Sequence, residues 1–355
     1  GEQEGIFYYQ RTIKNGMRFS AYDAFLKTAI KRKNVNIKKN TMVLKIIFKG
    51  LKAIGLVYER NNKKFEIFAN KEIILCAGAI GTPHLLQVSG IGDAEYLKSI
   101  GIDPLYEIKN VGEGLQDHYA VRVANKINLP ISLNEKARGY KLFVEIMKWF
   151  ILKKGLISYS PAHVGAFLKS SSEIDFPDLQ FVFTPASYTE GMIGKLQEVP
   201  GITCGVWQSR PLSRGYVRAL SQNIKDAPII QPNYLKEKTD QDVLVSGFKM
   251  CRALLKTSNM DKISVGETLP GQNIQTDEEI LNYLRNNGAT VYHAIGSCRM
   301  GIDDYAVVTP SLKIKGLSNI RIADASIMPT MPSGNTNAAT LMIAEKASDI
   351  IKKEL

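Results

Sequence analysis

Hydrophobic and polar residues follow two different periods along this chain. Residues 42–48 and 53–58 are apolar, strand-like runs separated by the glycine-containing stretch 49–52 with its two lysines, which predicts a hairpin that 64–68 extends as a third strand. Ser20 precedes apolar positions at helical spacing and is expected to cap a helix that begins there. We therefore expect a helix followed by a small antiparallel sheet.

The next apolar run indicates a different kind of strand. Residues 72–76 are almost continuously apolar, as expected for a strand covered on both faces. A glycine turn at 77–81 follows, and then Thr82 and Pro83, which suit the N-cap and first position of a helix over 84–88. This order lets backbone approach a cofactor closely and lets a helix N-terminus face negative charge.

The middle of the chain, residues 121–285, mixes strand-like and helical runs, which indicates an α+β insertion. Strands are expected at 179–183, 202–207 and 215–220, and helices at 142–152, 242–255 and 277–286. The run 143–152 is apolar enough for a helix on a membrane surface. It is short and two charges interrupt it, so packing against the sheet is favoured and membrane association stays the alternative.

After residue 285 the chain again shows a short strand-like run followed by a helical one, as in its first part. Residues 321–323 are strand-like, and 338–353 place apolar side chains at helical spacing. His293 lies in a segment of small residues and glycines before this strand, and Asn335 lies in a turn directly before this helix. A histidine and an asparagine on two separate turns are the layout of a site.

Composition narrows the class of protein. The 355 residues are 45% hydrophobic and 23% charged, which indicates a globular chain of two domains, or of one large domain with an insertion. The net charge of +12 comes from scattered lysines without interleaved aromatic residues, so a solvated basic surface is favoured over nucleic-acid binding.

The cysteines predict no disulfide framework and no metal site. Cys76, Cys204, Cys251 and Cys298 are widely spaced and form no paired motif, so a reducing, cytoplasmic location is expected. No run has the ~18 apolar residues of a membrane span.

His293 is the first candidate for chemistry. A neutral imidazole accepts a proton from a hydroxyl near neutral pH, although a lone histidine more often makes a structural hydrogen bond. Asn335 suits a helix N-cap, but the N–H groups at that helix end also stabilise an anion such as a reduced flavin. Asp324 follows a strand, where its carboxylate suits sugar-like hydroxyls as well as a surface turn.

Two nucleophile hypotheses have less support. Cys298 has no base at a spacing that predicts contact, and the serines form no nucleophile elbow.

Several stretches resemble the glucose-methanol-choline (GMC) oxidoreductases, and they occur in the family's order along nearly the whole chain. They are 78–92, 110–118, 211–215, 232–235, 292–301 and 324–337. The resemblance implies a Rossmann-like FAD-binding domain of α/β type, joined to an α+β substrate domain with an antiparallel sheet. The expected division is 1–120 and 286–355 for the FAD domain, and 121–285 for the substrate domain.

The resemblance also implies the chemistry: an FAD-dependent, choline- or alcohol-dehydrogenase-like enzyme, dehydrogenase or oxidase, that passes hydride from an alcohol to flavin N5. His293 would accept the hydroxyl proton and Asn335 would help hold the oxygen. The implied FAD contacts are Val43, Ala77, Gly78, Asp324, Ala325, Thr336 and Asn337. The substrate is a small-molecule alcohol. Choline would need an aromatic cage, for which Tyr159, Tyr188 and Trp207 are available.

The family's N-terminal strand, GxGxxG turn and helix have no counterpart in this sequence. We therefore expect a C-terminal fragment or one half of a split enzyme, with a separate N-terminal FAD-binding half as its partner. The alternative is a non-catalytic, truncated interaction protein.

Overall fold

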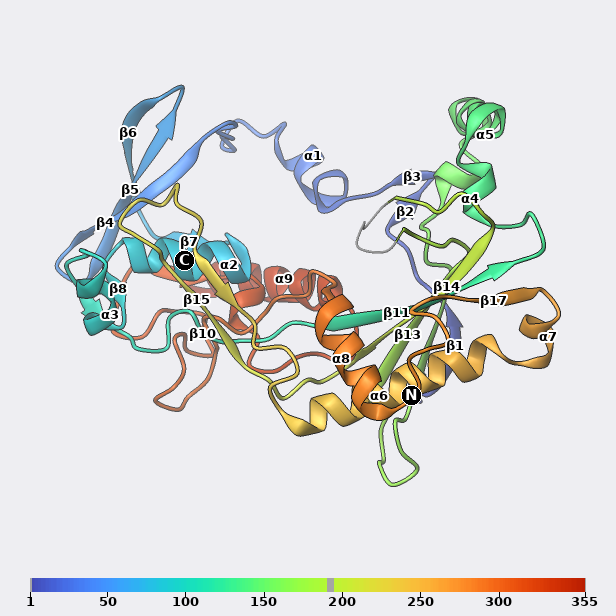
Figure 1. The fold of residues 1–355 in the computed structure, drawn as a ribbon. Coiled ribbons are helices and arrows are strands. Elements are labelled where there is room, and N and C mark those ends of the chain that lie inside the picture. Colours follow the sequence, from blue (N-terminus) through green and yellow to red (C-terminus); the bar gives the residue numbers. More distant parts are fainter. Residues whose placement is uncertain (1, 190–194, 355) are drawn as a thin grey trace. The chain divides into compact units, whose positions relative to one another are not determined.

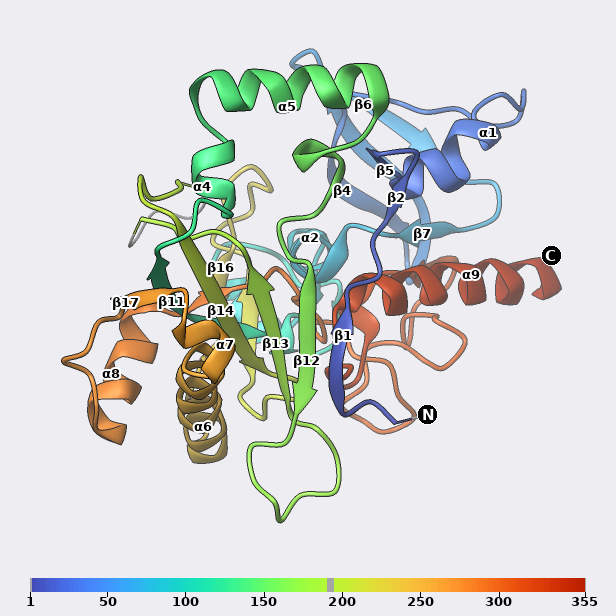
Figure 2. The ribbon, with the colours of Figure 1, turned by 90° about the vertical axis from the view of Figure 1, so that its right-hand side faces the viewer.

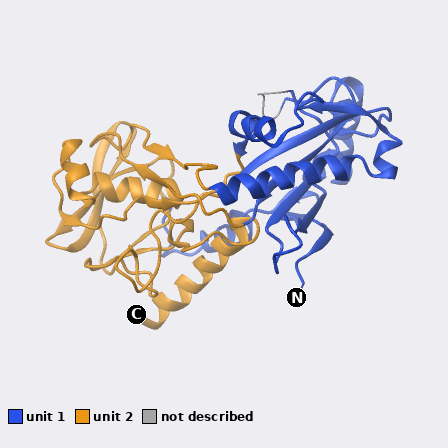
Figure 3. Cartoon of the chain, turned by 60° about the horizontal axis from the view of Figure 1, so that its bottom comes forward, with its two compact units in different colours: residues 1–37, 119–209, 238–289 blue, residues 38–118, 210–237, 290–355 orange. Residues whose placement is uncertain are grey.

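The computed structural model describes residues 2–189 and 195–354, so Gly1 and Leu355 lie outside the described residues. Figure 1 and Figure 2 label the helices and strands, and Figure 3 colours two compact units. Unit 1 comprises 1–37, 119–209 and 238–289; unit 2 comprises 38–118, 210–237 and 290–355. The sequence divides the chain at about 120 and 285, whereas here 1–37 group with the middle segment and 210–237 with the outer ones.

Unit 1 is built on an antiparallel sheet with the strand order β1-β12-β13-β14-β11-β17. All eight residues of β14 are buried, because β13 and β11 flank this strand. The bounds are β1 (Gly5–Tyr8), β11 (Tyr119–Ile127), β12 (Val164–Leu168), β13 (Leu179–Thr184), β14 (Gly201–Gln208) and β17 (Ser264–Leu269). The strands expected at 179–183 and 202–207 are confirmed.

Helix α6 (Lys238–Leu255) packs on this sheet, below β13 and β14 in Figure 1. Gly247 allows the close approach, since a Cβ atom there would lie 2.9 Å from the side chains of both Leu179 and Val206. Helix α8 (Asp277–Asn287) follows and packs against α6. The helices expected at 242–255 and 277–286 are confirmed, and their buried residues recur at helical spacing.

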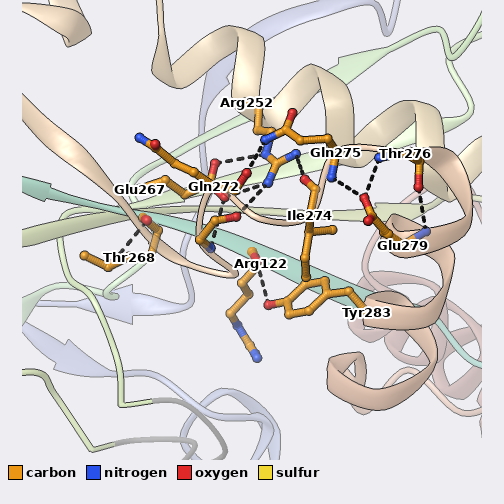
Figure 4. A network of polar contacts seen from close by, with 12 residues as sticks. Arg122, Arg252, Glu267, Thr268, Gln272, Ile274, Gln275, Thr276, Glu279 and Tyr283 are labelled. Carbon is orange, nitrogen blue, oxygen red and sulfur yellow. Dashed lines mark hydrogen bonds and ion pairs between the residues drawn. The ribbon is translucent and has the colours of Figure 1, made fainter.

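A polar network joins α6, β17 and the start of α8 (Figure 4). The Arg252 guanidinium donates to both carboxylate oxygens of Glu267, at 2.9 and 2.8 Å, and to the carbonyl of Ile274 at 2.6 Å. Thr276 and Glu279 form a capping box at the N-terminus of α8. The network thereby fixes the loop between β17 and α8.

Helix α5 (Gly139–Leu152) stands away from the strands of unit 1 in both Figure 1 and Figure 2, and none of its residues is buried. The helix expected at 142–152 is confirmed, but the expectation that it packs against the sheet is wrong. Its inner side instead meets the turn at 15–16, where the Trp149 indole donates to the carbonyl of Gly16 at 2.8 Å.

The remaining elements of unit 1 are short. They are β2 (Ile13–Lys14), β3 (Met17–Arg18), the π-helix η1 (Tyr22–Leu26), α1 (Lys27–Ala29), α4 (Leu133–Lys136), η2 (Leu156–Ser158) and α7 (Ser258–Asp261); β18 (Ala289–Thr290) spans the chain boundary between the units. The helix expected after Ser20 is present, but Ala21 is its N-cap. Ser20 bonds to the Asp23 carboxylate instead, at 2.8 Å.

Unit 2 contains four small sheets. The predicted hairpin and its third strand are confirmed as β4 (Met42–Lys49), β5 (Lys52–Arg60) and β6 (Lys63–Phe68). The other sheets are the parallel pair β7 (Ile73–Leu75) and β19 (Ile320–Ile322), the parallel pair β8 (Ile91–Gly92) and β9 (Tyr106–Glu107), and the antiparallel group β10 (Glu113–Leu115), β15 (Gly215–Arg218) and β16 (Ile229–Gln231).

The core of unit 2 gathers side chains from all three of its chain segments, including Leu86, Ala219 and Ile322. Its helices are α2 (Gly78–Val88), α3 (Ala94–Ser99), the 3-10 turn η3 (Ala325–Ile327) and α9 (Thr336–Glu354). Strand β7 is only partly covered, because Ile73 and Leu75 are buried while Ile74 between them is 42% exposed. The expectation of cover on both faces is therefore wrong for this strand.

Helix α2 begins earlier than its sequence signals indicate. Ala77 is its N-cap, so Thr82 and Pro83 lie inside the helix and do not start it. Pro83 has no N–H to donate to the carbonyl of Ala79 one turn earlier, and the Ser297 hydroxyl donates to that carbonyl instead, at 2.5 Å. The Thr82 hydroxyl, freed from a capping role, donates to the carboxylate of Asp324 at 2.6 Å.

Candidate functional site

His293 and Asn335, the two residues proposed for catalysis, meet within unit 2. His293 lies in the loop after β18, and Asn335 directly precedes α9. The amide Nδ2 of Asn335 lies 3.0 Å from Nε2 of His293. An amide NH₂ group only donates, so Nε2 of His293 presents its lone pair to this contact.

A second histidine completes the arrangement. Nδ1 of His118 lies 2.8 Å from Nδ1 of His293, and the two rings are nearly perpendicular at 85°. Because Nε2 of a neutral His293 accepts, its proton sits on Nδ1 and is donated to His118. His118 is fully buried, and its accepting nitrogen selects the tautomer of His293 in which Nε2 carries the lone pair.

Asp117 fixes the backbone of the same loop. One carboxylate oxygen accepts from the backbone N–H of His293 at 2.8 Å. The other accepts from the hydroxyl of Tyr234 at 2.5 Å and from that of Thr290. Asp117 is buried, so these donors replace the water that a carboxylate needs.

Gln116 connects this loop to two others. Its backbone N–H and C=O pair with those of Ile295, its side-chain oxygen accepts from the N–H of Met331 at 3.1 Å, and its side-chain nitrogen donates to the carbonyl of Pro211 at 2.6 Å. Arg210 adds bonds of 3.0 and 2.6 Å to the Ser333 hydroxyl, two residues before Asn335. The stretches 110–118, 211–215, 292–301 and 324–337 therefore converge on one site.

The environment keeps His293 neutral. Burial lowers the pKa of His293 below its usual range, and the nearby Asp117 carboxylate opposes this shift in part. The preceding residue, Tyr292, has a left-handed φ of 63°, which costs of order 1–3 kcal/mol in a residue other than glycine. Strain beside a half-buried base is characteristic of active-site loops.

The Asp324 carboxylate accepts hydrogen bonds from other residues of this chain. Oδ2 accepts from the backbone N–H of Gly78 at 3.0 Å and from Thr82, and Oδ1 accepts from the N–H of Ser326 at 2.8 Å. The negative charge expected at the N-terminus of α2 is thus the Asp324 carboxylate, a favourable placement for the helix dipole. Asp324 joins the end of β19 to the start of α2.

The predicted cofactor residues fall at three places in unit 2. Ala77, Gly78, Asp324 and Ala325 follow the carboxyl ends of β7 and β19, which lie at one edge because these strands are parallel. Thr336 and Asn337 form the first turn of α9, and Val43 lies on β4 in a different sheet.

The turn after β7 has the form that a flat cofactor needs. Gly78 adopts a left-handed φ of 80°, and a Cβ atom there would meet nothing within 4 Å. Cys76 and Ala77 beside it are exposed. The carboxyl ends of parallel strands are where ligands bind in α/β folds, so the backbone here fits a flavin.

The nucleophile hypothesis for Cys298 is wrong. The thiol is fully buried, and burial raises its pKa far above the usual range, with Asp324 adding to the shift. A buried protonated thiol is inert. All four cysteines are free.

Sequence reasoning quoted 110–118 only for its resemblance and gave no role to Gln116, Asp117 or His118. His118 is one of only four histidines and follows an aspartate, which is a signal for a site. Tyr234 and Thr82 carried no comparable signal, because their partners lie 117 and 242 positions away.

The chain belongs to the GMC oxidoreductase family. Family models described as GMC oxidoreductase match residues 1–120 and 211–344. This confirms the resemblance, and with it the class of FAD-dependent oxidoreductases at the level of the family.

Curated relatives align along almost the whole chain. An alcohol dehydrogenase [acceptor] of Pseudomonas putida is 38% identical over 359 residues, 99% of this chain and 64% of that protein. The mitochondrial choline dehydrogenase of Homo sapiens is 36% identical over 354 residues, covering 99% and 59%. This chain therefore spans less than two thirds of the length of these relatives.

Solved structures confirm the fold class. Pyridoxine 4-oxidase from Mesorbium loti superposes with a TM-score of 0.86 and 26% identity, over 98% of this chain and 64% of that one. A formate oxidase superposes with a TM-score of 0.93 and 22% identity, over 100% and 66%, which shows the fold alone.

One expectation finds no support. The N-terminal family model matches residues 1–120, so the comparisons do not support the absence of the N-terminal FAD-binding portion, nor a separate N-terminal half as partner.

Proposed function

We propose that this chain serves an FAD-dependent oxidation of a small-molecule alcohol, with His293 as the proton acceptor. The observation that carries the proposal is the pair of contacts at His293: Nδ1 bonds to His118 at 2.8 Å, and Nε2 faces the amide of Asn335 at 3.0 Å. A base with its tautomer fixed and its lone-pair nitrogen beside a hydrogen-bond donor suits removal of a hydroxyl proton.

The oxidation removes a hydride and a proton from the alcohol. FAD, when bound, would supply the acceptor for the hydride that leaves the carbinol carbon. His293 Nε2 takes the hydroxyl proton, and the amide of Asn335 donates to the same oxygen as negative charge develops on it. His118 accepts from Nδ1–H throughout, so the imidazolium that forms keeps a hydrogen-bond partner. The organic product is a carbonyl compound.

The cofactor residues follow from the same arrangement. Ala77, Gly78 and Ala325 offer an open turn at the ends of the parallel strands, and Asn337 with Thr336 offers the first turn of α9. Asp324 acts first by positioning the β7–α2 turn, and its carboxylate retains acceptor capacity for a flavin hydroxyl. Val43 is assigned the adenine end.

The relatives named for alcohols and for choline support the substrate class. For choline itself, the aromatic residues in unit 1 give little support. The ring of Tyr159 already faces the guanidinium of Arg11 at 4.9 Å, and Trp207 is only 4% exposed. We therefore propose a neutral alcohol, with unit 1 as the substrate-binding part and unit 2 as the flavin-binding part.

The test uses the purified chain. It is titrated with FAD, the bound flavin is followed by its absorbance, and primary alcohols and choline are added without oxygen. The proposal expects saturable FAD binding and bleaching of the oxidised flavin by a neutral alcohol. Failure to bind FAD, or bound FAD that no alcohol reduces, contradicts it.

A further inference from the structure

Helix α5 presents a continuous apolar stripe to solvent. Tyr140, Phe143, Val144, Met147, Phe150 and Ile151 follow one another at intervals of three and four residues, which places them on one side of the helix. Tyr140 is 79% exposed, Phe143 57%, and Phe150 and Ile151 68% each. A surface helix normally turns such a stripe toward the core, and here the stripe faces outward.

The opposite side of α5 is the attached one. The indole N–H of Trp149 donates to the carbonyl of Gly16, and the Glu145 carboxylate accepts from the backbone N–H of Leu156 at 2.6 Å. These contacts tie the helix to the turn at 15–16 and to the segment that follows it. These contacts therefore hold the helix with its apolar stripe facing outward.

The charges around the stripe have one sign. Lys141 and Lys148 are exposed on the helix and Lys154 is exposed just after it, and Lys153 lies over the ring of Trp149 at 4.2 Å. Glu145 is the only acidic residue in α5, and its carboxylate is bonded to Leu156 and lies 3.7 Å from Lys148. An apolar stripe rimmed by lysines matches anionic headgroups above an apolar layer.

We propose that α5 docks the protein on an anionic phospholipid surface, with the stripe from Tyr140 to Ile151 inserted at the boundary of headgroups and acyl chains. The described part of the chain contains no helix with the length and apolar character of a bilayer span. Because the apolar side chains of α5 lie on one side only, the helix would lie along the surface. The aromatic side chains and the lysines supply the two components, apolar burial and charge attraction, that such binding needs. This inference stands independently of the proposed reaction.

Sedimentation with vesicles tests the inference. The chain is mixed with vesicles of phosphatidylcholine alone, or of phosphatidylcholine with phosphatidylglycerol, at low and high salt. We expect binding to the anionic vesicles that weakens with salt, because salt screens the attraction between the lysines and the headgroups. Phe150→Ser with Ile151→Ser is expected to lower the partition about tenfold or more, because exposed apolar side chains drive insertion.

Two further variants distinguish the explanations. Phe176→Ser removes an aromatic ring that is 75% exposed elsewhere in unit 1, and its partition should match that of wild type. Lys141→Glu with Lys148→Glu should lower binding to the anionic vesicles. Equal binding by all variants, or no binding by wild type, overturns the inference. So does a lipid-free dimer that Phe150→Ser dissociates, since a second copy would then cover the stripe.

Discussion

The Nδ1 atoms of His118 and His293 lie 2.8 Å apart, and one of them must carry the proton that joins them. The amide of Asn335 on the other side of His293 decides which, because it donates to Nε2. Three residues from distant parts of the sequence thus fix a single protonation pattern, in which the buried His118 orients the base without reaching a substrate itself.

Replacing His118 tests its positioning role. His118→Leu removes the acceptor for Nδ1–H, so His293 loses its fixed tautomer, and flavin reduction by alcohol should slow at least about tenfold, or ~1.4 kcal/mol. His118→Gln supplies a carbonyl oxygen as acceptor and should recover most of the rate. The pH dependence of the rate should shift in the leucine variant and stay near wild type in the glutamine variant. Equal rates and pH profiles for both variants would show that His118 only fills space.

The stability of the protein should fall with pH below the ordinary histidine pKa. Burial lowers the pKa of His293 in the folded state, so below ~6.5 the unfolded chain binds a proton that the folded chain does not. Above pH ~6.5 His293 is neutral in both states and does not change the free energy of unfolding. As the pH falls below ~6.5, protonation of His293 in the unfolded chain progressively lowers the free energy of unfolding. Burial lowers the pKa of His84 in the same direction. Urea unfolding at several pH values should give a shallower dependence for His293→Gln than for wild type; parallel curves would refute the assignment.

The hydrogen bonds of Asp324 predict a small loss of stability for Thr82→Val and a larger one for Asp324→Asn. Thr82→Val removes one donor to the carboxylate and should lower the free energy of unfolding by about 1 kcal/mol. Asp324→Asn places an amide NH₂ among N–H and O–H donors and removes the charge that caps α2, so it should cost about 1–3 kcal/mol. Chemical denaturation measures both. An Asp324→Asn protein as stable as wild type would mean that the carboxylate is free for another partner.

The Arg252–Glu267 pair predicts a larger effect in unit 1. Both side chains are largely buried, at 12% and 10% exposure, so Arg252→Met leaves an uncompensated carboxylate and should cost about 3–5 kcal/mol. Lys238→Met is the matched control, because its ion pair with Asp242 is exposed and contributes about 1 kcal/mol at most. The double variant Arg252→Met with Glu267→Leu should regain much of the loss. Similar losses for Arg252→Met and Lys238→Met would argue against a buried pair.

The spacing of apolar residues in the sequence correctly predicted the helices and the hairpin whose formation depends on neighbouring residues alone. Helices α6 and α8 bury residues at helical spacing, and the β4–β5 hairpin turns at a polar stretch, so their sequences sufficed. Thr82 was misassigned because a threonine before a proline is an ordinary cap signal, while its actual partner is Asp324, far along the chain.

The site itself was predicted in part. His293 and Asn335 were chosen by their positions in turns and by resemblance, and the structure brings them together. The support from Gln116, Asp117 and His118 depends on three chain segments meeting, which no local period encodes. Helix α5 shows the same limit, because its apolar stripe is visible in the sequence but the direction that the stripe faces is not.

The most direct test of the account is the rate of flavin reduction by alcohol in the FAD-loaded protein, compared between wild type and His293→Gln in anaerobic stopped-flow mixing. If His293 accepts the hydroxyl proton, the variant should bind FAD as wild type does, while its reduction rate falls about 10²- to 10⁴-fold. A variant that binds FAD and is reduced at the wild-type rate would contradict the assignment of His293 as the base.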